Sequence, residues 1–125
     1  MNIKYHALVG IVGEAVAYLA HVPAHGAFFV ASIAPDFPLL ANEIRMLIKR
    51  EAFDPWKVPT PIFNAYHVTH SLFVSALLMW LLPAAGFGHL IHAITDWFTH
   101  TGRFASKPFY PVSNYTIKFG REILK

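Results

Sequence analysis

The sequence contains no cysteine. Disulfide bonds, thiolate zinc sites and cysteine nucleophiles are therefore excluded, and any bound metal must be held by nitrogen and oxygen ligands. Charge is also scarce, because charged residues make up 14% of the 125 residues, whereas a typical soluble domain carries roughly 25%. With 55% hydrophobic residues, the composition indicates a membrane, a hydrophobic partner or an unusually apolar small protein.

The ten lysines and arginines form no dense run and are not interleaved with aromatic residues. A nucleic-acid partner is therefore not expected. A formal net charge of +3 on an apolar protein fits an anionic membrane surface. We expect membrane association, with a cytoplasmic protein as the alternative.

Neither of the two long apolar stretches is a clean membrane span. Ser71–Gly88 is uncharged and reaches the lower limit of length for a spanning helix, but Pro83, Gly86 and Gly88 interrupt it. Ala7–Ala34 is apolar but contains charged and helix-breaking residues. A partly inserted bundle whose polar residues face inward agrees with this pattern.

Alanine, leucine and helical spacing recur throughout the chain, and the long polar–apolar alternation typical of strands does not occur. The sequence predicts an all-α fold, in which residues 1–125 form one compact bundle of about five or six helices around an inward-facing metal site. The helices are expected at Asn2–Ala20, His25–Ala34, Phe37–Arg50, Asn64–Leu82, Ala84–His100 and Asn114–Leu124. Asp36 and Ser113 are placed to cap two of them, and the prolines between Glu51 and Phe63 predict a connecting loop.

Histidine is frequent, with eight residues, and its spacing is informative. His67 and His70 are three apart in YHVTHS, which places both imidazoles on one helix face. His92, Asp96 and His100 follow one another at intervals of four in HAITDWFTH and form a polar stripe through an apolar helix. Helices that carry histidine and carboxylate residues at such spacing can direct them together at one ion.

A single histidine on an apolar helix is more often a core residue hydrogen-bonded to a carbonyl than a metal ligand. That alternative applies to each histidine taken alone, including His89, which extends the stripe by one turn. Two such motifs on consecutive helices favour metal binding, because burying several unpartnered imidazoles and a carboxylate would cost on the order of several kcal/mol. Two further candidates are His6, on the first helix, and Asp36, whose turn is stiffened by the preceding proline. Capping the next helix is the alternative role for Asp36.

The motifs follow one another along the chain as His6, SIAPD ending in Asp36, HVTHS, HAITDWFTH, and then Gly102 with KPF. In this order they resemble the predicted membrane-bound metal-dependent hydrolases of bacteria and archaea, the YdjM-like family. The resemblance runs from His6 to Phe109, and its specificity lies in the order of short motifs. A weaker similarity links the motif set to zinc-dependent phospholipases C, helical proteins whose His and Asp residues hold a metal cluster that cleaves phosphodiesters.

The resemblance implies that the metal ligands are His6, Asp36, His67, His70, His92 and Asp96. These nitrogen and oxygen ligands exceed one tetrahedral site and suit two divalent ions with open positions for water. Zinc is favoured, with manganese and iron as alternatives. Asp96 suits a bridging role because His92 and His100 flank it by one turn on either side. His100 itself is expected behind the ligands, orienting one of them or a water.

The expected function is metal-dependent hydrolysis of a phosphoester or a lipid-like ester, with a membrane lipid or a small phosphoester as the partner. Asp36 or Asp96 would orient the attacking water. Arg103 and Lys107 could neutralise a phosphate, or they are solvated surface charges. Ser71 is expected to be a helix-surface or supporting hydroxyl. The alternatives are a non-catalytic metal-binding protein at the membrane, and a small membrane protein whose histidines only hydrogen-bond one another.

Overall fold

The computed structural model describes residues 3–23, 26–52 and 54–117, and no strand occurs within those ranges. The α-helices are α1 (Ile3–Leu19), α2 (Ala27–Ile33), α3 (Phe37–Ile48), α4 (Thr60–Thr69), α5 (Leu72–Leu81) and α6 (Pro83–Thr99). The 3-10 turns between and after them are η1 (Ala34–Asp36), η2 (Pro55–Lys57) and η3 (Gly102–Phe104). The predicted all-α bundle is confirmed.

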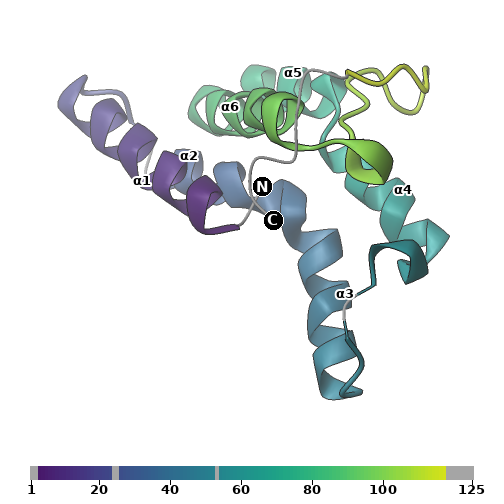
Figure 1. The fold of residues 1–125 in the computed structure, drawn as a ribbon. Helices are drawn as coiled ribbons and strands as arrows, with labels where there is room; N and C mark the ends of the chain where they lie inside the picture. The colour runs from purple at the N-terminus through teal and green to yellow at the C-terminus, as the bar shows by residue number, and fades with distance from the viewer. Residues whose placement is uncertain (1–2, 24–25, 53, 118–125) are drawn as a thin grey trace.

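Helix α6 lies inside the bundle, where it packs against α2 on one side and α5 on another (Figure 1). Helix α1 packs along α2, and α3 extends away from this group toward α4, with which it packs. The turn η1 joins α2 to α3 and also contacts α4 and α6. Asp36, the last residue of η1, therefore lies where the main helical group meets the α3–α4 arm.

At Pro35, where the sequence predicts the end of a helix, the chain forms the 3-10 turn η1 and not a loop. Helix α2, turn η1 and helix α3 follow one another directly and make one helical segment, Ala27–Ile48. Pro35 falls in the first turn of η1, where its missing N–H removes no helical hydrogen bond. Asp36 precedes α3 as predicted, but its side chain accepts no capping hydrogen bond. The predicted capping role of Asp36 is therefore wrong, and its carboxylate faces histidines instead.

The predicted helix Asn64–Leu82 is wrong in extent, because two helices, α4 and α5, meet there at a bend of 52°. Helix α4 begins earlier than predicted, at Thr60, since Pro61 suits the first turn of a helix. At the bend, Ser71 adopts extended backbone, and its Oγ accepts a hydrogen bond of 3.4 Å from a backbone N–H in the first turn of α5. The break leaves His70 at the end of α4, beside the interior of the bundle.

The segment that follows η3 is irregular, as predicted, and folds back over the helices. The Pro108 carbonyl accepts a hydrogen bond of 2.8 Å from the N–H of Leu72, at the start of α5. The predicted helix Asn114–Leu124 is not formed over residues 114–117, and its remainder lies outside the described residues. Ser113 instead accepts a hydrogen bond of 3.1 Å from the Tyr115 N–H, which makes a short turn.

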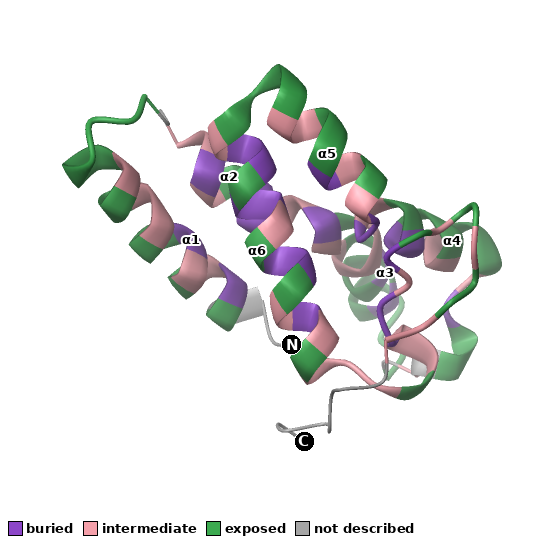
Figure 2. Cartoon of the chain, turned by 90° about the horizontal axis from the view of Figure 1, so that it is seen from above, coloured by how far each residue is buried: buried purple, intermediate pink, exposed green. Residues whose placement is uncertain are grey.

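Buried residues lie on the inward sides of the helices and exposed residues on their outward sides (Figure 2). Many of the buried residues are polar, and many large apolar side chains are exposed. Among the described residues, the largest fully buried side chain is that of Tyr66, and four histidines come next in volume. Val16 on α1, Trp80 on α5 and Phe98 on α6 are examples of exposed apolar side chains. The expected contact with lipid or with an apolar partner would cover such side chains, and it stays a prediction.

Within the part of the chain that the structure describes, one helical segment is long and apolar enough to cross a membrane by length and composition, namely Ala27–Ile48, of 22 residues. The bent pair α4 and α5 would make a second if it counted as one span. Core helices of soluble proteins meet the same criterion, so membrane residence stays a prediction.

Gly88 lies where α6 crosses α2 and leaves no room for a side chain. A Cβ at this position would lie 2.4 Å from the Phe28 carbonyl oxygen, a backbone atom that cannot rotate away. We expect Gly88→Ala to lower the free energy of unfolding by about 1–3 kcal/mol, because the helices must move apart. Denaturant titration measures the change. Phe87→Leu, at the neighbouring exposed position, is the control, and an equal loss in both variants would contradict the argument.

Candidate metal centre

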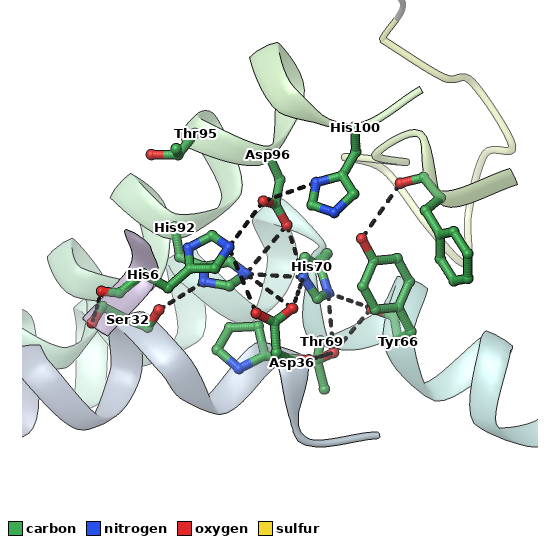
Figure 3. Close-up of polar contacts among 12 residues, drawn as sticks. His6, Ser32, Asp36, Tyr66, Thr69, His70, His92, Thr95, Asp96 and His100 are labelled. Carbon is green, nitrogen blue, oxygen red and sulfur yellow. Dashed lines mark hydrogen bonds and ion pairs between the residues drawn. The ribbon is translucent and has the colours of Figure 1, made fainter. Parts of the chain in front are cut away.

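Histidine and aspartate side chains from several elements converge in the interior (Figure 3). His6 comes from α1, Asp36 from η1, and His92 and Asp96 from α6; one ligand atom from each lies within 4.8 Å of the others. His70, at the end of α4, joins them, since its Nε2 lies 3.1 Å from Asp96 Oδ2. The structure thus brings together all the predicted ligands except His67.

Asp96 is fully buried and contacts histidines through both of its oxygens. Its Oδ1 lies 3.2 Å from His6 Nε2 and 3.0 Å from His100 Nδ1. Its Oδ2 lies 3.1 Å from His70 Nε2 and 3.3 Å from His92 Nε2. Each oxygen therefore faces a different pair of imidazoles.

Asp36 divides its oxygens in the same way. Its Oδ2 lies 3.6 Å from His6 Nε2, while its Oδ1 lies 3.4 Å from His70 Nε2 and 3.8 Å from His92 Nε2. The donors thus form two sets. We call them the His6 set (His6 with one oxygen each of Asp36 and Asp96) and the His70–His92 set (both histidines with the other oxygen of each aspartate).

Backbone carbonyls fix the rings of His70 and His92. His70 Nδ1 lies 2.7 Å from the Tyr66 carbonyl oxygen, and His92 Nδ1 lies 2.7 Å from the Ser32 carbonyl oxygen. A carbonyl can only accept, so in both rings Nδ1 carries a proton and donates it. In the neutral ring, Nε2 is then left with a lone pair directed at the centre, as in most histidines that bind metals.

The Nε2 atoms of His70 and His92 face each other at 2.9 Å. With a proton on each Nδ1, two lone pairs point at one another beside two carboxylates, which is repulsive unless a cation lies among them. That cation is either a proton or a metal. Imidazole nitrogens and carboxylate oxygens are a donor set that divalent metals accept, so the residues present fit a metal site.

The two aspartates set the charge of the centre. Burial alone would lower the pKa of His70, but its contacts with Asp36 and Asp96 raise that pKa to about 9. Burial alone would raise the pKa of Asp96, yet hydrogen bonds from the surrounding histidines hold it well below its usual range. The pKa of Asp36 is lowered by histidines in the same way, against the effect of burial, whereas burial lowers the pKa of His6. Both carboxylates are therefore charged at neutral pH.

Two residues of the centre are partly exposed. The side chains of Asp36 and His100 are 14% and 20% exposed, whereas those of His6, His70 and Asp96 are at most 1% exposed. Water or a substrate would reach the donors past Asp36 and His100.

His67 does not join this group of donors. Its ring packs edge-on against Phe63, with centroids 4.4 Å apart, and lies 5.6 Å from the ring of Tyr110. Both ring nitrogens are buried and have no hydrogen-bond partner among the described residues. Burial, helped by the charge of Lys107, lowers the pKa of His67 to about 4. The geometry places this predicted ligand apart, as a neutral side chain between α4 and the segment after η3.

The predicted supporting residues lie around the centre in different ways. His100 follows α6 and contacts Asp96 through Nδ1, as a residue that orients a ligand would. Ser71 is buried directly after His70, and its hydroxyl caps α5. Ser71 thereby fixes the bend that ends α4.

Arg103 packs against the start of α4. Its guanidinium lies 4.5 Å above the ring of Phe63, and it donates a hydrogen bond of 3.4 Å to the Val58 carbonyl. The interaction of Arg103 with a phosphate stays a prediction.

Sequence reasoning missed the groups that orient the ligands. Ser32 and Tyr66 act through backbone carbonyls, which residue type cannot indicate. Thr69, which lies between the two histidines of YHVTHS, was also left unassigned. Its hydroxyl donates a hydrogen bond of 2.9 Å to the Pro35 carbonyl, next to Asp36. Only the fold brings these groups together.

Comparison with models of known protein families, with curated proteins and with solved structures gives no match for this chain. The resemblance to the YdjM-like hydrolases therefore stays a prediction. The geometry of the centre is the basis for assigning a function.

Proposed function

We propose that the centre binds two divalent ions and that the protein uses them to hydrolyse an ester. The observation that carries the proposal is the division of the donors into two sets by Asp36 and Asp96, each of which turns one oxygen to the His6 set and the other to the His70–His92 set. Carboxylates that bridge two ions have this arrangement in helical di-metal proteins. His100, through its contact with Asp96 Oδ1, would orient that oxygen of the His6 set.

Zinc is the ion we propose first, with manganese and iron as alternatives. Imidazole and carboxylate ligands serve all of them, and the sequence has no thiolate to select among them. Two buried carboxylates also require compensating positive charge, which divalent cations supply.

Divalent ions in such a site would lower the pKa of a bound water and place positive charge beside the oxygens of the substrate. We assign Asp36 to holding that water, because its carboxylate belongs to both donor sets and is also partly exposed. Asp96 is enclosed by histidines, so we assign it to holding the two ions together rather than to holding the water. Hydrolysis, as opposed to binding alone, is supported by the resemblance of the motif order to the YdjM-like family and, more weakly, to zinc-dependent phospholipases C.

The proposed substrate is a phosphoester or a lipid-like ester at a membrane. Helices α1, α5 and α6 expose large apolar side chains, which lipid would cover. The low content of charged residues, 14%, agrees with this placement.

Elemental analysis and turnover test the proposal together. Protein purified without a histidine tag should carry about two equivalents of metal and should hydrolyse a generic phosphodiester or carboxylic ester only when metal is present. Metal without turnover on either substrate would identify a non-catalytic metal-binding protein. Absence of stoichiometric metal would mean that the histidines only hydrogen-bond one another, and the proposal would be wrong.

A further inference from the structure

A second set of buried polar contacts lies behind the metal centre. His89 stands one turn before His92 on α6, and its Nδ1 lies 2.8 Å from Ser75 Oγ on α5. Its Nε2 lies 2.6 Å from the carbonyl oxygen of Thr69, the last residue of α4. Ser75 and His89 are 2% and 3% exposed. Neither is among the proposed ligands.

The acceptors fix the direction of these hydrogen bonds. The Thr69 carbonyl can only accept, so Nε2 of His89 carries the proton. Nδ1 of a neutral ring is then an acceptor, and the Ser75 hydroxyl donates to it. Both nitrogens of His89 are thus used, in one tautomer.

Thr69 carries the contacts on to the turn that holds Asp36. Its hydroxyl donates to the Pro35 carbonyl at 2.9 Å, and shares the same proton with the Tyr66 carbonyl at 2.9 Å. We call the series from Ser75 through His89 and Thr69 to Pro35 the His89 brace. The brace contacts two backbone carbonyls beside proposed ligands. The Thr69 carbonyl directly precedes His70, and the Pro35 carbonyl directly precedes Asp36.

The bend between α4 and α5 explains why such a brace is needed. The last carbonyls of a helix have no partner within the helix, and a buried carbonyl without a donor is costly. His89 supplies a donor to the Thr69 carbonyl. The end of α4, and with it His70, is thereby held at one position against α6.

We propose that the His89 brace positions His70 and Asp36 for metal binding, and that His89 is its central positioning residue. This inference rests on the metal centre proposed above. It assigns to His89 a role that the stripe His89, His92 and Asp96 does not indicate, since His89 turns away from the ligands toward α5 and the end of α4.

Matched pairs of variants test the brace. His89→Leu removes both contacts, whereas His89→Gln keeps an N–H that reaches the Thr69 carbonyl. Thr69→Val removes the hydroxyl at nearly constant shape, and Thr69→Ser keeps it. We expect His89→Leu and Thr69→Val to weaken the binding of Zn²⁺ and Co²⁺ on the order of tenfold and to change the visible spectrum of bound Co²⁺. The Gln and Ser variants should retain most of the affinity and the wild-type spectrum.

Melting of the metal-free protein distinguishes a brace that positions the ligands from contacts that only stabilise the fold. A lower melting temperature in His89→Leu, with unchanged affinity and an unchanged Co²⁺ spectrum, would overturn the inference. If wild-type protein takes up neither Zn²⁺ nor Co²⁺, the proposed function fails first and the brace inference falls with it. If wild type binds and His89→Leu binds equally, only the brace is wrong.

Nitrogen NMR of the wild-type imidazoles gives a test that does not depend on the variants folding. In metal-free protein, His89 should show a single neutral tautomer with the proton on Nε2 and a hydrogen-bonded Nδ1. A proton on Nδ1, or averaging of the two tautomers, would overturn the brace.

Discussion

Asp96→Asn is expected to abolish stoichiometric metal binding and, with it, any hydrolysis. The carboxylate of Asp96 contacts His6, His70 and His92 from inside the centre, and asparagine would remove its charge and turn an N–H₂ group toward imidazole lone pairs. Removing one partner of a buried ionic group costs roughly 3–5 kcal/mol, which corresponds to a loss of at least about a hundredfold in metal affinity. Competition with a chelating dye measures the affinity.

Thr95→Ala is the matched control for Asp96→Asn. Thr95 precedes Asp96 on α6, and its hydroxyl donates to the Ile91 carbonyl of its own helix. This variant should bind metal and turn over substrate as wild type does. Activity or metal content that survives Asp96→Asn would remove Asp96 from the centre and the bridging role with it.

Chelation of the metal is expected to lower the melting temperature by on the order of 10 °C. A ligand that binds only the folded state stabilises it by about 4 kcal/mol when present at a thousand times its dissociation constant. Scanning calorimetry in mild detergent, before and after chelation, gives the shift.

Restoration by added metal separates this effect from damage by the chelator. Zn²⁺ added in excess of the chelator should return the melting temperature to its starting value. Asp96→Asn should melt at one temperature with or without chelator. A chelator-sensitive Asp96→Asn protein would show that the stabilising ion binds elsewhere.

Much of the helical framework follows from local sequence, but its breaks do not. Apolar periodicity and prolines locate α1, α3 and α6 to within a few residues. The bend at Ser71 was not predicted, because serine caps a helix only when its own backbone leaves the helical region. Here the N–H of the next residue, Leu72, is taken by the carbonyl of Pro108, far along the chain. That contact is visible only in the fold.

In the candidate site, too, the sequence identified what depends on one helix and missed what depends on the fold. Spacing on one helix identifies His92 and Asp96 directly, since i and i+4 share a face. His6 and Asp36 come from separate elements; local sequence made them candidates, and the resemblance, not their spacing, assigned them as ligands. The same resemblance named His67, which packs against the rings of Phe63 and Tyr110 instead. A spacing of three puts two imidazoles on one side of α4 but does not give both a partner there.

The polar character of the buried residues has a consequence for the shape of the stability curve. The heat capacity of unfolding rises with the apolar area newly exposed and falls with the polar area. Because histidines, serines and an aspartate fill buried positions while many large apolar side chains are already outside, unfolding uncovers comparatively little hydrocarbon. The free energy of unfolding should therefore curve only weakly with temperature below the melting point, and cold should loosen this fold less than it loosens one built around an apolar core.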